Sequence, residues 1–187
     1  VPLVEIVGFE VLLNLFNRYF TTSDEYGSGL SSLADNLQGG WIIDQDPFAT
    51  NQLLHPYQGS IYHGLARSTG LTYWEALVYD FAGSTLWELA GETGPPSLND
   101  EITTTIGGSF LGEALFRMAS LVLESGGTNP GFFRELFAFL ISPPTGFNRV
   151  MPIPIVLTMR QPPVIVPRAI ARWHTRTIQN GNSIFPD

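Results

Sequence analysis

Two predicted helices carry polar side chains at positions where the helical repeat predicts apolar ones. On the first of them, the apolar residues Leu77 and Phe81 are followed at helical spacing by Ser84 and Glu88. Because residues three or four apart share one helix face, this stripe predicts a hydroxyl and a carboxylate inside the protein. A carboxylate in that position could serve as a general base.

The next predicted helix has the same anomaly. Its apolar residues Ile102, Ile106 and Phe110 lead into Glu113 and Arg117, an ionisable pair one turn apart. A buried carboxylate without a partner is costly, so we expect each of these acids to be protonated or paired. The cationic partners that the sequence offers are Arg67, Arg117, Arg134 and Arg149.

These side chains permit two interpretations. We favour a structural one, in which Glu88, Glu113 and the arginines form a buried salt-bridge network that fixes the register of the helices. The alternative is an enzyme that acts on a lipid-linked or cell-wall substrate by acid–base chemistry, with its residues facing one cavity. Its predicted catalytic residues are His55, Glu88, Glu92 and Asp100, with Arg67 or Arg117 holding an anionic group.

A divalent metal site is a third hypothesis, built from His55, His63 and the neighbouring acids. However, the sequence contains no HExxH motif and no pair of histidines one helical turn apart. A lone histidine before a proline, as in His55-Pro56, is more often a turn residue. We therefore predict no metal and no other cofactor.

The composition excludes several classes of site. The chain has 187 residues, 44% of them hydrophobic, which is enough to bury one core without disulfides. It contains no cysteine and no lysine, so thiolate chemistry, a P-loop lysine and a Schiff-base lysine are excluded. The formal net charge of −8 argues against nucleic acid as a partner, because polyphosphates bind clustered cations.

The charge changes sign along the chain. Residues 1–149 contain five arginines against 16 acids, whereas residues 150–187 contain four arginines and a single acid, Asp187. The latter segment is also rich in proline, which disfavours regular helix. We therefore divide the chain into a helical domain, residues 1–150, and a basic, partly irregular tail, residues 151–187, with room for a short helix at 168–176.

Helical periodicity and capping residues predict a mainly α fold, a compact bundle of about five helices followed by the tail. Capping boxes mark two helix starts, Thr72 with Glu75 and Ser97 with Asp100. A long irregular loop, including residues 44–56, precedes the central helices and is of the kind that often carries function. The predicted helices lie at 2–20, 31–37, 58–68, 72–91, 97–124 and 130–141.

The long apolar runs leave membrane association open. Each run is interrupted by Glu, Asp or Arg, so none is a clean span of about 20 apolar residues. Small residues nevertheless recur on two helices at spacings that allow close packing, either in a water-soluble bundle or in a membrane-embedded one with internally paired charges. They are Ala76, Gly83 and Ala90 on one helix and Thr104, Gly108 and Gly112 on the next.

Four motifs resemble an uncharacterised bacterial family, the domain-of-unknown-function family numbered 3943. They are DPFATNQLLHPYQGSIYHGLAR at 46–67, GSTLWELAGE at 83–92, PPSLNDEITTTIGGSFLGEALFRM at 95–118 and GFNR at 146–149. The resemblance covers about residues 41–149. The positions that carry over are Asp46, Asn51, His55, Gln58, Gly59, Arg67, Ser84, Trp87, Glu88, Glu92, Ser97, Asn99, Asp100, Thr105, Gly107, Gly112, Glu113, Arg117, Asn148 and Arg149.

The resemblance implies a bacterial cell-envelope protein, periplasmic or in the outer membrane, without an assigned activity. The same order of elements more faintly resembles VanZ-like envelope proteins. We expect a structural or interaction module whose 44–56 loop docks a lipid, a glycan or an outer-membrane partner. Its predicted binding residues are Gln58, Arg67, Ser84, Trp87, Asn99, Glu113, Arg117, Asn148 and Arg149.

Overall fold

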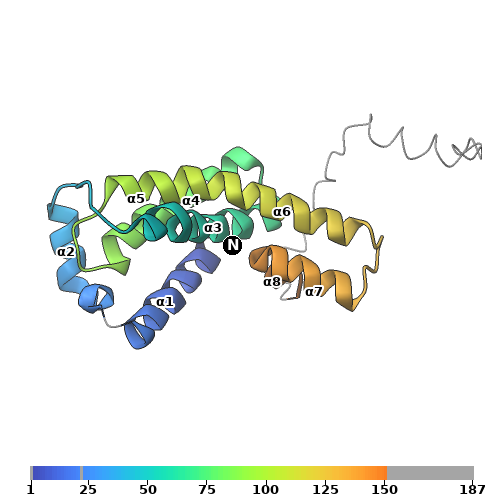
Figure 1. The fold of residues 1–187 in the computed structure, drawn as a ribbon, viewed down its shortest axis with the longest axis horizontal. Helices are drawn as coiled ribbons and strands as arrows, with labels where there is room; N and C mark the ends of the chain where they lie inside the picture. Colours follow the sequence, from blue (N-terminus) through green and yellow to red (C-terminus); the bar gives the residue numbers. More distant parts are fainter. Residues whose placement is uncertain (1, 22, 151–187) are drawn as a thin grey trace, which may run out of the picture.

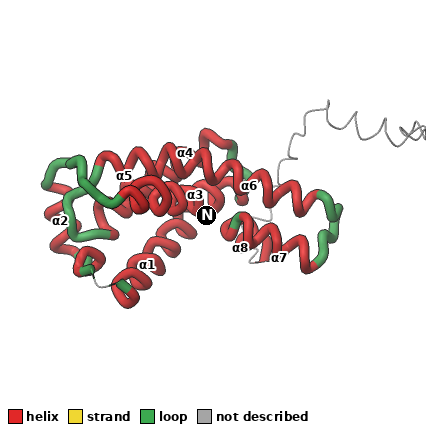
Figure 2. The backbone as a smooth tube through the Cα atoms, viewed as in Figure 1, coloured by secondary structure: helices red, strands yellow, loops and turns green. Residues whose placement is uncertain are grey.

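The computed structural model describes residues 2–21 and 23–150. In this part of the chain the regular elements are all helical and join into seven continuous helices (Figures 1 and 2). The mainly α prediction is confirmed, with more helices than the predicted five or so. The expected short helix at 168–176 lies outside the described residues.

The first helix, α1 (Pro2–Phe20), has the predicted bounds and is followed by a single 3₁₀ turn, η1 (Asp24–Tyr26), and by α2 (Leu30–Gln38). Polar side chains of α1 hold this connection in place. Asn14 Nδ2 donates to the carbonyl oxygen of Gly91 at 2.7 Å, and Arg18 donates to the carbonyl oxygens of Tyr26 and Ser28. The connection is therefore fixed both to α1 and to the end of a central helix.

The loop expected up to Pro56 is shorter than predicted. Helical structure begins at Phe48 and continues through a π-helical turn, η2 (Thr50–Leu54), into α3 (His55–Ser68). The sequence suggested a loop because proline has no N–H to donate within a helix. Pro56 fits into the helix because it lies in the first turn of α3, where no N–H is needed. A wide π turn precedes it, closed by the hydrogen bond from His55 N to the Thr50 carbonyl oxygen.

Both predicted helix starts are confirmed, with a complete capping box at Thr72 and Glu75 and a one-sided cap at Ser97. Thr72 caps α4 (Tyr73–Leu86), which continues as a π turn, η3 (Trp87–Gly91). Ser97 accepts from the backbone N–H of Asp100 and starts a continuous rod of 27 residues. That rod consists of α5 (Leu98–Ile102), the π turn η4 (Thr103–Gly107) and α6 (Gly108–Glu124).

Of the last two helices, α7 packs against α6, and α8 packs against α3 and α7. The predicted helix near residue 130 is α7 (Phe132–Ile141), and a further helix that the sequence did not predict, α8 (Pro143–Val150), follows it directly. Pro143-Pro144 indicated a stop. Prolines also fit the first turn of a helix, and here they start α8 after ending α7.

The helix α3 lies at the centre, in contact with α1, α4, α6 and α8. It crosses α6 where glycines face each other: a Cβ added to Gly108 would lie 2.5 Å from Gly59 Cα, and one added to Gly112 would lie 2.6 Å from the Cβ of His63. The close approach predicted from small residues on the α5–α6 rod is therefore confirmed for Gly108 and Gly112.

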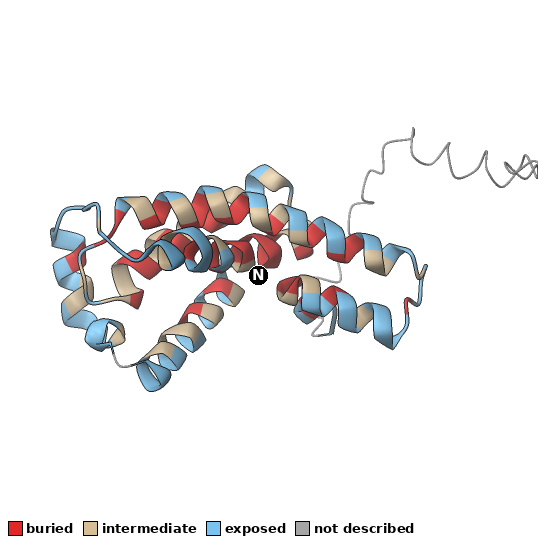
Figure 3. Cartoon of the chain, viewed as in Figure 1, coloured by how far each residue is buried: buried red, intermediate tan, exposed pale blue. Residues whose placement is uncertain are grey.

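Burial is inverted relative to a water-soluble bundle, which corrects both predicted stripes. Ile102, Ile106 and Phe110 are exposed, as is Phe81. The buried face of the α5–α6 rod instead carries small and polar residues, and that of α4 carries Ala76, Asp80, Gly83 and Ser84. Only small residues fit at the close helix crossings, so the bulky apolar side chains lie outward. Figure 3 shows the buried residues where the helices face one another and the exposed residues on their outer sides.

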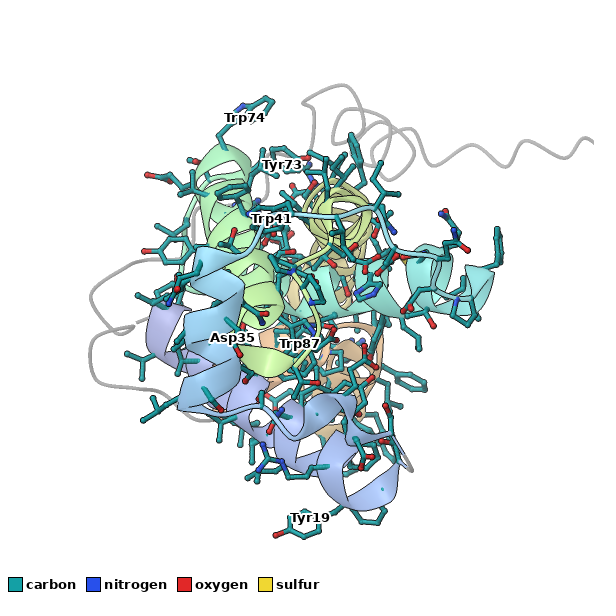
Figure 4. The ribbon with its side chains drawn as sticks, turned by 90° about the vertical axis from the view of Figure 1, so that its left-hand side faces the viewer. Tyr19, Asp35, Trp41, Tyr73, Trp74 and Trp87 are labelled. Atoms are coloured by element: carbon teal, nitrogen blue, oxygen red, sulfur yellow. The ribbon has the colours of Figure 1, made fainter. Side chains whose placement is uncertain are left out.

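The side-chain view shows the same inversion. Trp74 and Tyr19 point away from the bundle on opposite sides, with 73% and 79% of their surface exposed, whereas Trp87 lies among the helices (Figure 4). Among the described residues, the buried apolar cluster is small and is formed by Ile6, Tyr62 and Leu65. Bulky apolar groups thus cover the outside of the described bundle.

Candidate functional site

The first group of interacting polar residues, the central cluster, consists of the buried or largely buried His63, Arg67, Asp80 and Glu113 and the exposed Arg117. His63 Nδ1 lies 2.7 Å from Asp80 Oδ2, and its Nε2 lies 3.3 Å from Glu113 Oε2. Arg67 Nε donates to Glu113 Oε2 at 2.7 Å, and Arg117 Nε donates to Glu113 Oε1 at 2.6 Å. The cluster therefore joins α3, α4 and α6 through one continuous network.

Helix geometry explains how these residues meet. His63 and Arg67 are one turn apart on α3, and Glu113 and Arg117 are one turn apart on α6. Gly112 lets α6 approach α3 closely beside His63. The close approach brings the Glu113 carboxylate within reach of His63 and Arg67. The predicted pairing of Glu113 with arginines is confirmed.

The central cluster is closed to solvent at its histidine. The side chains of His63 and Asp80 are fully buried, and the Arg67 guanidinium also stacks over the Phe116 ring, 4.6 Å from its centroid. Both ring nitrogens of His63 face carboxylates, so the doubly protonated imidazolium can donate to both. The imidazole of His63 therefore has no surface that solvent can reach.

The second group, the end cluster, consists of Asp44, Asp46, His55, Asn99 and Asp100 and lies at the end of the bundle next to the 39–47 loop. His55 Nε2 lies 3.6 Å from Asp100 Oδ1. Asn99 Nδ2 donates to Asp44 Oδ1 at 2.7 Å, and Asn99 Oδ1 accepts from the backbone N–H of Asp44 at 3.1 Å. One asparagine thus fixes the loop to the start of α5.

Backbone pairing positions the same loop. Ile42 N donates to the Pro96 carbonyl at 2.9 Å, and Leu98 N donates to the Ile42 carbonyl at 2.8 Å. These two hydrogen bonds form an isolated β-bridge between Ile42 and Ser97, the residue that caps α5. The bridge places Asp44 and Asp46, two and four residues further on, beside the first turn of α5. Acids from a loop and from a helix start therefore converge.

The end cluster differs from the central one in its protonation and access. Burial lowers the pKa of His55, against the opposing charges of Asp46 and Asp44, so the neutral imidazole is favoured. Burial pushes the pKa of Asp44 upward, but hydrogen bonds from Asp100, Asn99 and the Asp46 backbone leave it below its usual value.

Asp46 is exposed, so this group of residues has a side open to solvent. The donor atoms of Asp46, His55 and Asp100 lie within 4.8 Å of one another, an arrangement that could hold a metal ion.

Two further acids lie beside the end cluster. Glu88 is buried, and its Oε2 accepts from the backbone N–H of Ser97 at 2.7 Å, so its predicted arginine partner is replaced by a backbone amide. Glu92 Oε1 accepts from Trp87 Nε1 at 2.8 Å. Burial raises the pKa of Glu88 to about 8, and burial with the charges of neighbouring acids raises that of Glu92 to about 7. The surroundings of both acids thus bring their pKa values close to neutral pH and favour the uncharged form.

Residues 40–144 match the family described as "Domain of unknown function (DUF3943)". The chain belongs to this family. No curated protein and no solved structure matches it. The resemblance to the family, drawn above from four motifs, is confirmed, and the family description itself assigns no activity to the DUF3943 domain.

The DUF3943 structure separates the residues predicted to share one catalytic cavity. His55, Glu88 and Asp100 gather at the end of the bundle, with Glu92 beside them. Arg67 lies 12 residues beyond His55 on α3, about 18 Å along the helix, and belongs to the central cluster. Arg117 lies there too. The predicted anion-binding arginines are therefore not next to the predicted acid and base.

The remaining predicted binding residues stabilise the interior or lie outside it. Gln58 donates to the Tyr62 hydroxyl at 2.6 Å, and Ser84 is buried on α4. Asn148 reaches across from α8 to Ser68 Oγ at 2.7 Å. Arg149 makes only an exposed pair with Glu135 and takes part in neither cluster. Arg134, named as a possible partner of the buried acids, contacts Ser125 and the Pro130 carbonyl instead.

Three residues of the DUF3943 clusters were not among the predicted site residues: Asp44, Asp46 and Asp80. Asp80 was missed because the predicted buried stripe of α4 ran through Leu77 and Phe81. Asp44 was treated as part of a docking loop, and Asp46 was named only for the family resemblance. His63 was noted only as a possible metal ligand. The signal that could have identified Asp80 is its spacing: it is four residues from Ala76 and from Ser84, on the face of small residues.

Proposed function

We propose that this DUF3943 chain is a bacterial cell-envelope module that sits in a lipid bilayer, with its bulky apolar side chains toward the acyl chains and its ionisable groups paired inside. The observation that carries the proposal is the inverted burial. Among the described residues, 21 polar or charged side chains are buried against nine hydrophobic ones, while 35 large hydrophobic side chains are exposed. A water-soluble domain of this size buries most of its large aliphatic residues.

Large exposed apolar patches mark contact with a protein partner or with lipid. Here the exposed groups are distributed over α1, α4, α6 and α7, which lie on different sides of the bundle (Figures 1 and 3). A single protein partner would cover one side. Acyl chains surround a bundle, so lipid is the occupant that fits this distribution.

Helix dimensions support the same proposal. The rod from Leu98 to Glu124 has the length and hydropathy of a membrane-crossing helix, and only a third of its apolar window is buried. At 1.5 Å per residue its 27 residues extend about 40 Å, compared with about 30 Å for the hydrocarbon core of a bilayer. Its ionisable residues before Arg117, namely Asp100, Glu101 and Glu113, face the interior or a partner.

An apolar groove of about 440 Å³ adds a specific place for an acyl chain. It lies between α1 and the α7–α8 pair, and Glu5 is its sole ionisable lining residue. Phe9 and Leu12 line one wall, and Phe139 and Phe147 line the other. A flexible hydrocarbon chain matches such a surface without requiring any polar partner.

The two clusters fit this environment. An isolated charge in hydrocarbon is expensive, so ionisable residues inside a membrane pair with one another and face the interior. The central cluster does this for His63, Arg67, Asp80 and Glu113, whereas Arg117, with 57% of its side chain exposed, pairs with Glu113 from the outside. We infer that it holds α3, α4 and α6 in register, the structural role that the sequence favoured.

Flotation with liposomes tests the proposal. The purified full chain, transferred from detergent into phosphatidylethanolamine–phosphatidylglycerol vesicles, should float with the lipid and resist extraction at alkaline pH. Ile106→Glu should reduce recovery with the vesicles, because a charge at the bilayer centre costs about 3 kcal/mol, whereas the matched variant Ile106→Leu should not. A chain that stays monodisperse in buffer without detergent, unaffected by Ile106→Glu, would refute the proposal.

Acid–base catalysis on a lipid-linked or cell-wall substrate is supported by one specific observation, the 3.6 Å approach of His55 Nε2 to Asp100 Oδ1 beside an exposed loop. Such an enzyme would have to bind its substrate at the end cluster without the help of Arg67. Release of product from a lipid-linked precursor by the full chain, lost in His55→Ala, would support it.

A further inference from the structure

We propose that the end cluster binds one divalent transition-metal ion through Asp46, His55 and Asp100, with Asp44 as an additional carboxylate. This inference is independent of the bilayer proposal, since it concerns the loop end of the bundle and is measured without lipid. It also differs from the sequence-based prediction of no metal. Four side chains from a loop and two helices supply the donors.

The distances fit a cation. Donor atoms around a tetrahedral ion with bonds of about 2.1 Å lie about 3.4 Å apart, and His55 Nε2 lies 3.6 Å from Asp100 Oδ1. The donor atoms of Asp46 lie within 4.8 Å of both. Because Asp46 is an exposed loop residue, its side chain can rotate the remaining distance without disturbing the helices.

The state of His55 is an independent indication. Its side chain is 8% exposed, and Nε2 is buried without a hydrogen-bond partner. A buried polar atom left without a partner costs free energy that folded proteins rarely tolerate. The lone pair of a neutral imidazole nitrogen is a common metal donor, and a cation between His55 and Asp100 would satisfy it.

The surroundings resemble the outer shell of a metal site. Asn99 Nδ2 donates to Asp44 Oδ1 at 2.7 Å and to Asp100 Oδ1 at 3.2 Å, which orients both carboxylates.

The donor set selects the class of ion. One imidazole with two or three carboxylates suits Zn²⁺ or Mn²⁺, whereas Mg²⁺ and Ca²⁺ prefer oxygen ligands throughout. The exposed side of Asp46 leaves room for water or an anionic group in the remaining positions. The site would also fasten the 39–47 loop to the starts of α3 and α5.

Calorimetric titration of the chelator-treated full chain in detergent with ZnCl₂ and with MnCl₂ tests the inference. We expect one ion per chain, and an affinity for MgCl₂ and CaCl₂ at least tenfold weaker. Asp46→Asn, which should leave the fold intact because the residue is exposed, should weaken binding about tenfold or more, as should His55→Ala. Helix content from circular dichroism accompanies each variant.

Two control variants locate the ion. Glu124→Gln removes an exposed acid at the far end of α6, and His174→Ala removes a histidine of the tail; both should bind as the parent chain does. Absence of Zn²⁺ and Mn²⁺ binding by the parent chain would overturn the inference. Binding that persists unchanged in both Asp46→Asn and His55→Ala would overturn it as well.

Discussion

His63 Nδ1 lies 2.7 Å from Asp80 Oδ2, and neither side chain has any exposed surface. The pair joins the centre of α3 to the centre of α4 in a bundle whose outside is apolar. Its energetic role follows from this position, because a buried ion pair adds modest net stability while it is intact, but its disruption leaves one partner uncompensated.

Asp80→Ala should therefore lower the free energy of unfolding by about 3–5 kcal/mol. The matched control is Glu135→Ala, which breaks the half-exposed pair with Arg149 and should cost less than about 1 kcal/mol. Equilibrium unfolding of the full chain, followed by circular dichroism, measures both. Equal losses for the two variants would contradict a structural role for the buried pair.

The two arginines that bind Glu113 should contribute unequally. Arg67 has 11% of its side chain exposed and Arg117 has 57%, although the two Nε–O distances are nearly the same. Truncating the buried cation leaves an uncompensated carboxylate, so Arg67→Ala should cost several times as much unfolding free energy as Arg117→Ala. The same unfolding measurement checks this ratio, and a larger loss in Arg117→Ala would be inconsistent with the central cluster described here.

The crossing of α3 and α6 predicts a contrast between two glycines. A Cβ at Gly108 would clash with the backbone of Gly59, whereas a Cβ at Gly8 on α1 meets nothing within 4 Å. Gly108→Ala should destabilise the chain by at least about 1–3 kcal/mol. Gly8→Ala should stabilise it by up to about 1 kcal/mol, through higher helix propensity. Tolerance of alanine at Gly108 would show that the helices do not cross so closely.

Stability should fall as the pH rises from about 4.5 to about 8. The folded-state pKa of Glu88 is raised to about 8 from an ordinary 4.5, so this acid favours the folded state most below pH 4.5 and loses that contribution progressively as the pH rises to 8. Each group of this kind contributes a slope of about 1.4 kcal/mol per pH unit. Glu88→Gln can still accept from Ser97 N–H and should flatten the slope by one proton. An unchanged slope would mean that Glu88 is ionised in the folded protein.

Local signals in the sequence were sufficient for the helix boundaries that depend on them. Thr72 and Ser97 start their helices because each side chain satisfies a free backbone N–H within three residues. Pro56 and Pro143 misled the prediction because proline is compatible with both a stop and a first turn. For Pro56, the preceding π turn decides that a helix starts there. For Pro143, the abrupt turn after α7 decides it.

The inside and outside of the helices could not be derived from apolar periodicity. Ser84 and Glu88 were correctly expected to be buried, but from a stripe whose member Phe81 is exposed. The rule fails here because small residues occupy the helix crossings and bulky apolar ones face outward. The pairing of His63 with Asp80 depends on how α3 and α4 pack, which no spacing within one helix determines.

The most direct test is the environment of the exposed apolar face in a bilayer. The chain contains no cysteine, so single spin labels can be placed at Ile106→Cys and Val11→Cys, with Thr128→Cys in the α6–α7 turn as the aqueous control. After reconstitution into vesicles, we predict that labels at 106 and 11 collide more with oxygen than with a water-soluble nickel chelate, and that the label at 128 shows the reverse. Labels at 106 and 11 that collide mainly with the nickel chelate would contradict the bilayer proposal.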